Sequence, residues 1–315
     1  MIQYLVILLD DTSVSFCHYN NPNNERRQMP LNTLKAGIRY AMKENLNIQF
    51  VYPDYPLPEE YEEAIDSVDH IKIKPSACAE GADVVVFDNV ETLVGIADLS
   101  KSVAYTLRTD KQSLFAGVEK LFPILYKVER LNIVITDIES FTDNDFNTYK
   151  SVLDILAKEI EKVYVEGKTV QLNLLTDRMM LDKMNNCGAG DSCITLAPDG
   201  MFYLCPAFYH AEDGFAIGSI ASGLDIKNQQ LYRLDHAPLC RNCDAYQCKR
   251  CIWLNRKTTL EVNTPSHEQC VVVHLERNAS RNLLLAIRKH GMFLPEKEDI
   301  REIDYLDPFD VREEW

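Results

Sequence analysis

Cysteine is the residue type whose spacing points most directly to chemistry in this sequence. The 315-residue chain contains ten cysteines, and eight of them lie between residues 187 and 270, where two Cys-x2-Cys pairs are separated by four residues. Thiolates two residues apart can both reach one metal from a tight loop, and four thiolates suit zinc or an iron–sulfur cluster. The count therefore predicts two metal centres with these ligands: Cys187, Cys193, Cys205, Cys240, Cys243, Cys248, Cys251 and Cys270.

The spacing alone leaves the identity of the metal open. Two structural zinc sites and two iron–sulfur clusters account equally well for eight thiolates. A histidine near these cysteines could replace one thiolate, although a histidine in such a place is more often a surface or hydrogen-bonded residue. The histidines in question are His210, His236 and His267.

The first residues of the chain bear on whether these thiols are reduced. The apolar run Tyr4–Leu9 is only six residues long, lacks a basic start, and is followed by Asp10 and Asp11. A signal peptide would have a longer apolar run and a small-residue cleavage site. We therefore expect a first strand and a cytoplasmic protein, whose thiols stay reduced and bind metal instead of forming disulfides.

Composition excludes several classes of protein. The chain has 33 Lys and Arg against 48 Asp and Glu, a formal net charge of −15, which argues against nucleic acid as the main partner. No run approaches the roughly 18 consecutive apolar residues that a membrane-spanning helix needs. A hydrophobic fraction of 46% is enough to fill a large core, so a globally disordered chain is excluded.

The residues before the cysteine-rich segment alternate between short apolar runs and helical patterns. Most runs are continuous, which is typical of parallel strands covered on both faces. We expect strands at Tyr4–Leu9, Ile48–Tyr52, Ile71–Ile73, Val84–Phe87, Val103–Leu107, Ile133–Ile138 and Val170–Leu175. Apolar stripes predict helices over 31–46, 114–125 and 146–163, with a kink at Pro123 in the second. This order predicts βαβ units and a parallel sheet, open or closed into a barrel.

Polar residues follow the expected strands, at the edge where the active sites of such folds gather. They could bind a polar peptide or act as acid and base, although loops after strands are also polar simply because they meet water. The residues at these strand ends are Asp10, Asp11, Arg108, Asp137, Glu139, Asp177 and Arg178.

Several segments around the cysteines match a known pattern: residues 187–190, 197–206 and 215–220, the four cysteines between 240 and 251, and Cys270. Together they resemble a SPASM domain, the C-terminal module of radical SAM enzymes that modify peptides and proteins. The sequence departs from that pattern at Lys249-Arg250-Cys251, where Gly-Gly-Cys is usual. The resemblance favours iron–sulfur over zinc and implies two 4Fe–4S clusters. By position, Cys187, Cys193, Cys205 and Cys251 would hold one cluster, and Cys240, Cys243, Cys248 and Cys270 the other.

The first part of the chain lacks the motifs with which a radical SAM barrel uses S-adenosylmethionine. Such a barrel carries CxxxCxxC after its first strand; with Cys17 at the third position, Asp10 and Val14 occupy the first two. One thiolate cannot hold a cluster that needs three. The Gly-Gly-Glu-Pro motif after the second strand is also missing, since residues 52–56 are Tyr-Pro-Asp-Tyr-Pro. We therefore expect that the protein does not cleave S-adenosylmethionine.

The opening strand, the segment Phe16-Cys17-His18-Tyr19 and the cysteine-rich segment together resemble the CXXX repeat peptide maturases. These proteins are similar to radical SAM maturases and act with small Cys-repeat precursor peptides. The resemblance implies an α/β fold: a partial (β/α)6 TIM-like barrel of radical SAM type over residues 1–183, a SPASM-like module over 184–275, and a C-terminal helix and acidic tail over 276–315. It implies maturation of a ribosomally made peptide by clusters that bind the precursor or relay electrons, with a redox protein or a second maturase as partner. The alternative is a non-catalytic, zinc-stapled scaffold or partner subunit that binds the peptide.

Overall fold

The computed structural model of the protein describes residues 1–211 and 214–301. Its main feature is a nine-stranded sheet with the strand order β7-β6-β5-β4-β3-β2-β1-β8-β9. Neighbouring strands from β7 to β8 run parallel, and β9 is antiparallel to β8. The strands are β1 (Tyr4–Leu8), β2 (Asn47–Val51), β3 (His70–Pro75), β4 (Val84–Phe87), β5 (Ala104–Thr109), β6 (Arg130–Ile135), β7 (Gln171–Leu172), β8 (Cys193–Leu196) and β9 (Phe202–Tyr203).

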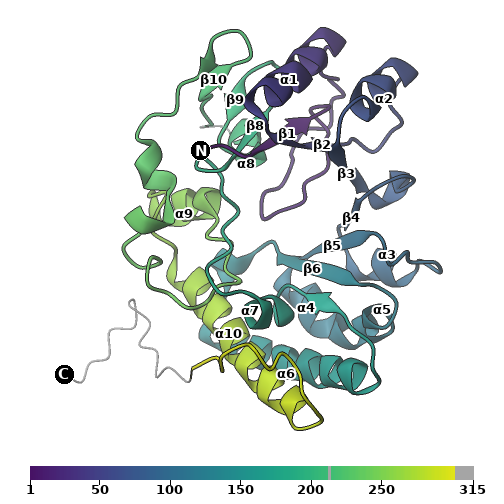
Figure 1. Cartoon of the computed structure of the whole chain (residues 1–315), viewed down its shortest axis with the longest axis vertical. Helices are drawn as coiled ribbons and strands as arrows, with labels where there is room; N and C mark the ends of the chain where they lie inside the picture. The colour runs from purple at the N-terminus through teal and green to yellow at the C-terminus, as the bar shows by residue number, and fades with distance from the viewer. Residues whose placement is uncertain (212–213, 302–315) are drawn as a thin grey trace.

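Helices lie to both sides of the strands in the view of Figure 1. In the view of Figure 1, α2 (Glu59–Asp66), α3 (Val90–Val94) and α5 (Phe122–Leu125) lie to the right of the strands. By contrast, α9 (Ile252–Thr259) and the start of α10 (His267–Arg288) lie to the left. Ile252 of α9 nonetheless belongs to the same core cluster as Tyr61 of α2, so elements on both sides of this view pack into one core.

Strand β1 joins the first part of the chain to the cysteine-rich segment. Leu5 of β1 pairs with Ile48 of β2 on one side and with Ile194 of β8 on the other. Leu5 packs into the core beneath the outer helices, whereas Val6 belongs to a separate cluster on the opposite face. Because β1 is buried on both faces, it needs the continuous apolar run that Tyr4–Leu9 supplies. The parallel sheet predicted from such runs is confirmed.

Helix α1 (Leu31–Glu44) packs directly over the junction between β1 and β8. Its buried face contains Leu34, Gly37 and Ile38. A Cβ at position 37 would lie 2.5 Å from Leu196 Cδ2 of β8, so a larger residue there would require the Leu196 side chain to move. The predicted helix over 31–46 is confirmed, and it packs closely on the strand that follows the cysteine turn.

Helices α6 (Asp143–Val165) and α10 pack together and against the far end of the sheet. A capping box begins α6, because Thr142 Oγ1 accepts from the N–H of Asp145 while Asp145 Oδ2 accepts from the N–H of Thr142. Tyr149 of α6 donates to Glu276 Oε1 of α10 at 2.8 Å. The helix predicted over 146–163 is confirmed, and it anchors the helix that carries Cys270.

The single helix predicted over 114–125 is wrong. The segment divides into α4 (Lys111–Gly117), a 3-10 turn (Val118–Leu121) and α5. Pro123 lies in the first turn of α5, where its missing N–H costs no hydrogen bond. The proline therefore starts a new helix and does not kink a continuous one.

The last predicted strand, over 170–175, is shorter than expected. Only β7 (Gln171–Leu172) pairs with β6. The Thr176 hydroxyl accepts from the N–H of Leu172 at 2.8 Å and donates to its C=O at 3.0 Å, which closes a turn. Helix α7 (Thr176–Met180) begins at that residue, so the apolar residues after β7 pack in a turn instead of extending the sheet.

The remaining elements of the cysteine-rich segment are short: α8 (Pro206–His210) and the two-stranded sheet of β10 (Gly218–Ser219) and β11 (Gly223–Leu224). Within residues 1–211 and 214–301, no helix is long and apolar enough to cross a membrane. Most of the predicted acidic tail, residues 302–315, lies outside the described residues.

Candidate metal centres

The first predicted ligand set comes from four separate pieces of the chain. Cys193 begins β8, Cys205 directly precedes α8, and Cys251 directly precedes α9. Cys187 lies in the loop before β8, where its N–H donates to the C=O of Lys249 at 3.1 Å. This bond places Cys187 beside the loop that carries Cys251.

Charge interactions place these four thiols in one region. Burial raises the pKa of the Cys205 thiol far above its ordinary value, and the charges of Cys251 and Cys187 raise it further. Burial and the charge of Cys187 also raise the pKa of Cys251 to about 12 and that of Cys193 to about 12. The structure therefore brings together the four cysteines that the resemblance assigns to one cluster.

Glycines shape the turn between Cys187 and Cys193. Gly190 has a φ of +78°, and a Cβ there would lie 2.7 Å from Cγ of Tyr232. Gly188 has a φ of +73°, and its C=O accepts from the N–H of Cys193 at 2.9 Å. Side chains at these positions would strain the backbone or clash, so the turn depends on glycine.

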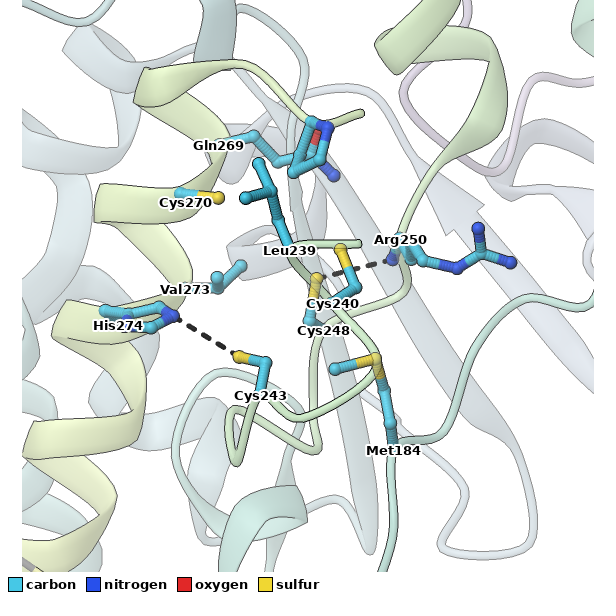
Figure 2. A pocket seen from close by; sticks show the side chains of 11 residues that line it. Met184, Leu239, Cys240, Cys243, Cys248, Arg250, Gln269, Cys270, Val273 and His274 are labelled. Atoms are coloured by element: carbon cyan, nitrogen blue, oxygen red, sulfur yellow. Dashed lines mark hydrogen bonds between the residues drawn. The ribbon is translucent and has the colours of Figure 1, made fainter. Parts of the chain in front are cut away.

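The second predicted ligand set lines a small cavity of about 20 Å³ between the cysteine loop and α10 (Figure 2). Cys240, Cys243 and Cys248 approach the cavity from the loop, and Cys270 approaches it from α10. His274 lies one turn after Cys270 on the same helix and lines the same cavity. The structure therefore brings the second four cysteines together as well, and it adds a histidine that was not among the predicted ligands.

Hydrogen bonds reach two sulfurs of this second set. The N–H groups of Arg250 and Ala245 donate to Cys248 Sγ at 3.3 Å and Cys243 Sγ at 3.4 Å. His274 Nε2 lies 3.4 Å from Cys243 Sγ (Figure 2). These bonds favour the thiolate, as metal binding requires. Burial nevertheless raises the pKa of the Cys248 thiol, because it outweighs the N–H bond.

Arg250 lies where the SPASM pattern that the sequence resembles has its second glycine of Gly-Gly-Cys. Its φ is +45°, a left-handed conformation that glycine adopts without strain and arginine does not. The Arg250 side chain is buried and donates to the C=O of Tyr232. The turn before Cys251 thus keeps the backbone shape of a glycine, held in place by the arginine side chain.

Cys17 lies near the first set, which the sequence did not predict. The residues around it, Val14 and Phe16, pack against the same apolar cluster as Cys193. Burial raises the pKa of the Cys17 thiol, and the charges of Cys251 and Cys187 add to this rise, whereas Arg108 opposes it. No local pattern could have revealed this neighbourhood, because the other thiols follow Cys17 by more than 160 residues.

Asp10, which the resemblance aligns with the first position of CxxxCxxC, is fully buried. Its Oδ1 accepts from the N–H of Thr12 at 2.8 Å and from the Thr12 hydroxyl at 2.6 Å. Its Oδ2 accepts from the Tyr55 hydroxyl at 2.7 Å, and Tyr55 belongs to the segment that replaces Gly-Gly-Glu-Pro. The two positions that differ from the radical SAM motifs are therefore bonded to each other.

A polar cavity of about 580 Å³ lies at the carboxyl edge of the first strands. It has the size of a small-ligand site. Its charged groups are paired, since Arg108 contacts Asp88 at 2.7 Å and Arg26 contacts Asp54 at 3.8 Å. Hydroxyl and amide groups make up most of the remaining lining: Thr12, Ser13, Ser15, Asn20, Asn21, Asn23 and Asn24. We call it the mouth cavity.

Other polar residues at the strand ends serve structural contacts. Asp177 forms a two-bond ion pair with Arg130 of β6 at 2.8 and 2.9 Å. Asp137 Oδ1 accepts from the N–H of Lys111 at 2.9 Å, and Glu139 pairs with Lys257. The remaining contacts are those of Arg178 with Asp244 at 3.5 Å and of Asp11 with Arg27 at 2.9 Å.

The three histidines considered as substitute ligands lie in different places. The His210 ring stacks on that of Tyr19 with centroids 5.7 Å apart. His236 contacts Asp235. His267, the first residue of α10, has its ring against that of Phe146 of α6. None of the three lines the cavity of the second set.

Neither set has the compact arrangement of a preformed single-ion site. Within the described residues, no group of three or more His, Cys, Asp and Glu side chains is placed so that it could hold a metal ion. The ligand role of the eight cysteines therefore stays a prediction, supported by their grouping into two sets of four.

Comparison with known proteins gives information on the fold. No family model matches the sequence, and no curated protein matches it. The structure of native anSMEcpe with bound AdoMet and Cp18Cys peptide is similar with a TM-score of 0.63 and 12% identity, covering 92% of this chain and 100% of that one. Histidine-tagged anSMEcpe with bound AdoMet gives a TM-score of 0.63 and 13% identity over the same shares. The predicted α/β fold with a large parallel sheet is confirmed.

Proposed function

We propose that the protein takes part in the maturation of a ribosomally made, Cys-repeat peptide, and that its cysteine-rich segment holds two 4Fe–4S clusters. The observation that carries the proposal is the division of eight thiols into two sets of four in space. A similar overall fold occurs in a structure described as containing AdoMet and a peptide, which supports a peptide as partner.

The donor sets fit such clusters by their chemistry. Cys187, Cys193, Cys205 and Cys251 would hold the first cluster, which we call the first centre. The second centre would be held by Cys240, Cys243, Cys248 and Cys270. When bound, a cluster supplies either an iron that accepts a substrate thiolate or a carrier for single electrons. The chain itself covers most of these sulfurs and donates N–H groups to Cys243 and Cys248, which would tune the potential.

The mouth cavity is the proposed contact site for the precursor. It lies at the strand edge where ligands bind in folds of this kind. Ser15 supports this role, because it is buried, its Oγ has no hydrogen-bond partner among the described residues, and it lines the cavity. A redox protein or a second maturase would supply electrons or complete the reaction. A reducing compartment such as the cytoplasm suits ten cysteines that are all free in the structure.

Metal analysis of protein purified without oxygen tests the proposal. We expect a brown protein with about eight iron and eight sulfide per chain, as two 4Fe–4S clusters require. Cys270→Ala should lose about half of the iron, because it removes a ligand of the second centre only. Cys78→Ala should lose none, because Cys78 lies on a surface turn and donates to the C=O of Asp54.

Other results of the same analysis would reject the clusters. A colourless protein with about two zinc per chain would favour the non-catalytic scaffold that binds the peptide. Neither metal in stoichiometric amount would contradict both forms of the proposal.

A further inference from the structure

The loop between β1 and α1 folds back over the sheet and is closed at its base. Asp10 and Gln28 form an antiparallel bridge, and the N–H of Met29 donates to the C=O of Leu9 at 2.9 Å. We call residues 11–28 the return loop. Its outer part lines the mouth cavity, and its inner part carries Cys17.

A buried arginine holds the inner part of the return loop in place. Arg108 Nε donates to the C=O of Cys17 at 2.9 Å, and its Nη2 donates to the C=O of Tyr19 at 2.7 Å. Arg108 is only 7% exposed and also pairs with Asp88. Charge-assisted bonds of this kind fix a backbone firmly, so the position of Cys17 is defined by the barrel itself.

Contacts across the return loop place Cys17 against the segments of the first centre. The Tyr19 ring stacks on His210 of α8, the helix that directly follows Cys205. Phe16 packs against the apolar cluster that Cys193 also contacts. The residues just before and just after Cys17 therefore contact the segments that carry Cys193 and Cys205.

The five thiols differ in their access to water. Cys187 is exposed, whereas Cys17, Cys193, Cys205 and Cys251 are partly covered. A 4Fe–4S cluster takes one thiolate per iron, so one of five is surplus. The exposed ligand is the one that solvent and a substrate thiol reach first.

We propose that Cys17 is a fifth sulfur donor of the first centre and takes the place of Cys187 when that exposed ligand leaves its iron. In this exchange the iron–sulfur bond to Cys187 breaks and that sulfur takes up a proton. The Cys17 thiol loses its proton and forms the new iron–sulfur bond, so no atom changes oxidation state. The inference rests on the proposed function, because it assumes that the first centre is an iron–sulfur cluster.

Iron content of single and double variants tests the exchange. Cys187→Ala should keep the wild-type amount of iron, about eight per chain. Cys17→Ser should also keep it, because the four other ligands remain. The double variant should lose about half of the iron, because the first centre then has only three thiolates. A Cys187→Ala protein that loses as much iron as the double variant would overturn the proposal.

Cys78 provides the matched control. It is the other cysteine outside the 187–270 segment, and it lies on the 3-10 turn Ser76–Cys78. The double variant with Cys78→Ser and Cys187→Ala should keep the iron of the wild type. If it loses half, removal of any second cysteine is the cause, and the role of Cys17 is rejected.

A second measurement separates this proposal from the presence of clusters. Purified full-length protein is oxidised with diamide, its remaining thiols are alkylated, and its disulfides are mapped by mass spectrometry. We expect Cys17 in a disulfide with one of the four cysteines of the first centre and Cys78 alkylated. If the wild type lacks iron, the disulfide map still decides whether Cys17 lies with the four cysteines of the first centre. Recovery of Cys17 in alkylated form would reject the proposal that it is a fifth donor.

Discussion

At the scale of single residues, the cysteine-rich segment depends on buried polar groups as well as on thiols. Glu276 of α10 is buried and accepts hydrogen bonds from Tyr149 and Gln247. Gln247 also donates to the C=O of Val273 at 2.7 Å, which ties the loop between Cys243 and Cys248 to the helix. A carboxyl group in this place links the barrel helix α6, the cysteine loop and α10.

Glu276 should make the stability of the protein depend on pH. Burial, aided by the charge of Asp177, raises its pKa from 4.5 to about 7, although the bonds from Tyr149 and Gln247 oppose the rise. Between these two pH values the folded protein keeps a proton that the unfolded chain releases. The free energy of unfolding therefore falls as pH rises through this window, by at most about 3 kcal/mol.

Glu276→Gln removes this dependence. We expect the variant to be more stable than the wild type at pH 8, by about 1 to 3 kcal/mol, and to lose most of that advantage at pH 5. Urea unfolding at both pH values measures the difference. Glu166→Gln, on the surface at the end of α6, should show neither effect. An equal gain at both pH values would contradict a titration of Glu276.

At the scale of elements, α10 connects the second set of cysteines to the core around α6. Leu283 is 1% exposed and packs in the core shared with α6, whereas Leu285 on the same helix is 37% exposed. Leu283→Ala should lower the free energy of unfolding by about 2 to 5 kcal/mol. Leu285→Ala should change it by less than about 0.5 kcal/mol. Chemical unfolding of the two variants checks this, and equal losses would place α10 outside the core.

The elements also indicate how far sequence patterns reach. Continuous apolar runs predicted the buried strands, because a strand covered on both faces has no room for polar residues. The apolar run over 170–175 predicted too long a strand. The Thr176 hydroxyl closes a turn there, and the pattern of apolar residues does not encode this turn. Pro123 was placed in a helix interior, although it occupies a first turn.

The candidate site could be predicted only in its local part. The two Cys-x2-Cys pairs are visible in the sequence, and a Cys-x3-His spacing could have pointed to His274 beside Cys270, since residues four apart share a helix face. Cys17 joins the first set through packing of distant segments. Likewise, the left-handed backbone at Arg250 depends on a contact with Tyr232 that no neighbouring residue signals.

At the scale of the whole molecule, the loop after β1 is held to the sheet by polar contacts. Asp10, Thr12 and Tyr55 hydrogen-bond to one another at the positions where the sequence differs from the radical SAM motifs. We therefore expect no 5′-deoxyadenosine when the reduced protein is incubated with S-adenosylmethionine, as chromatography of the products would measure. Catalytic formation of 5′-deoxyadenosine would contradict the proposed loss of this chemistry. A radical SAM enzyme assayed in parallel serves as the positive control.

The position of β1 between β2 and β8 has a consequence for synthesis on the ribosome. β1 leaves the ribosome well before its partner β8, which begins only at residue 193. Until then, one row of its backbone N–H and C=O groups faces no partner, which makes nascent chains prone to associate through that edge. Chains that stop short of residue 193 should aggregate, and the sheet is completed on this side of β1 only after β8 has emerged.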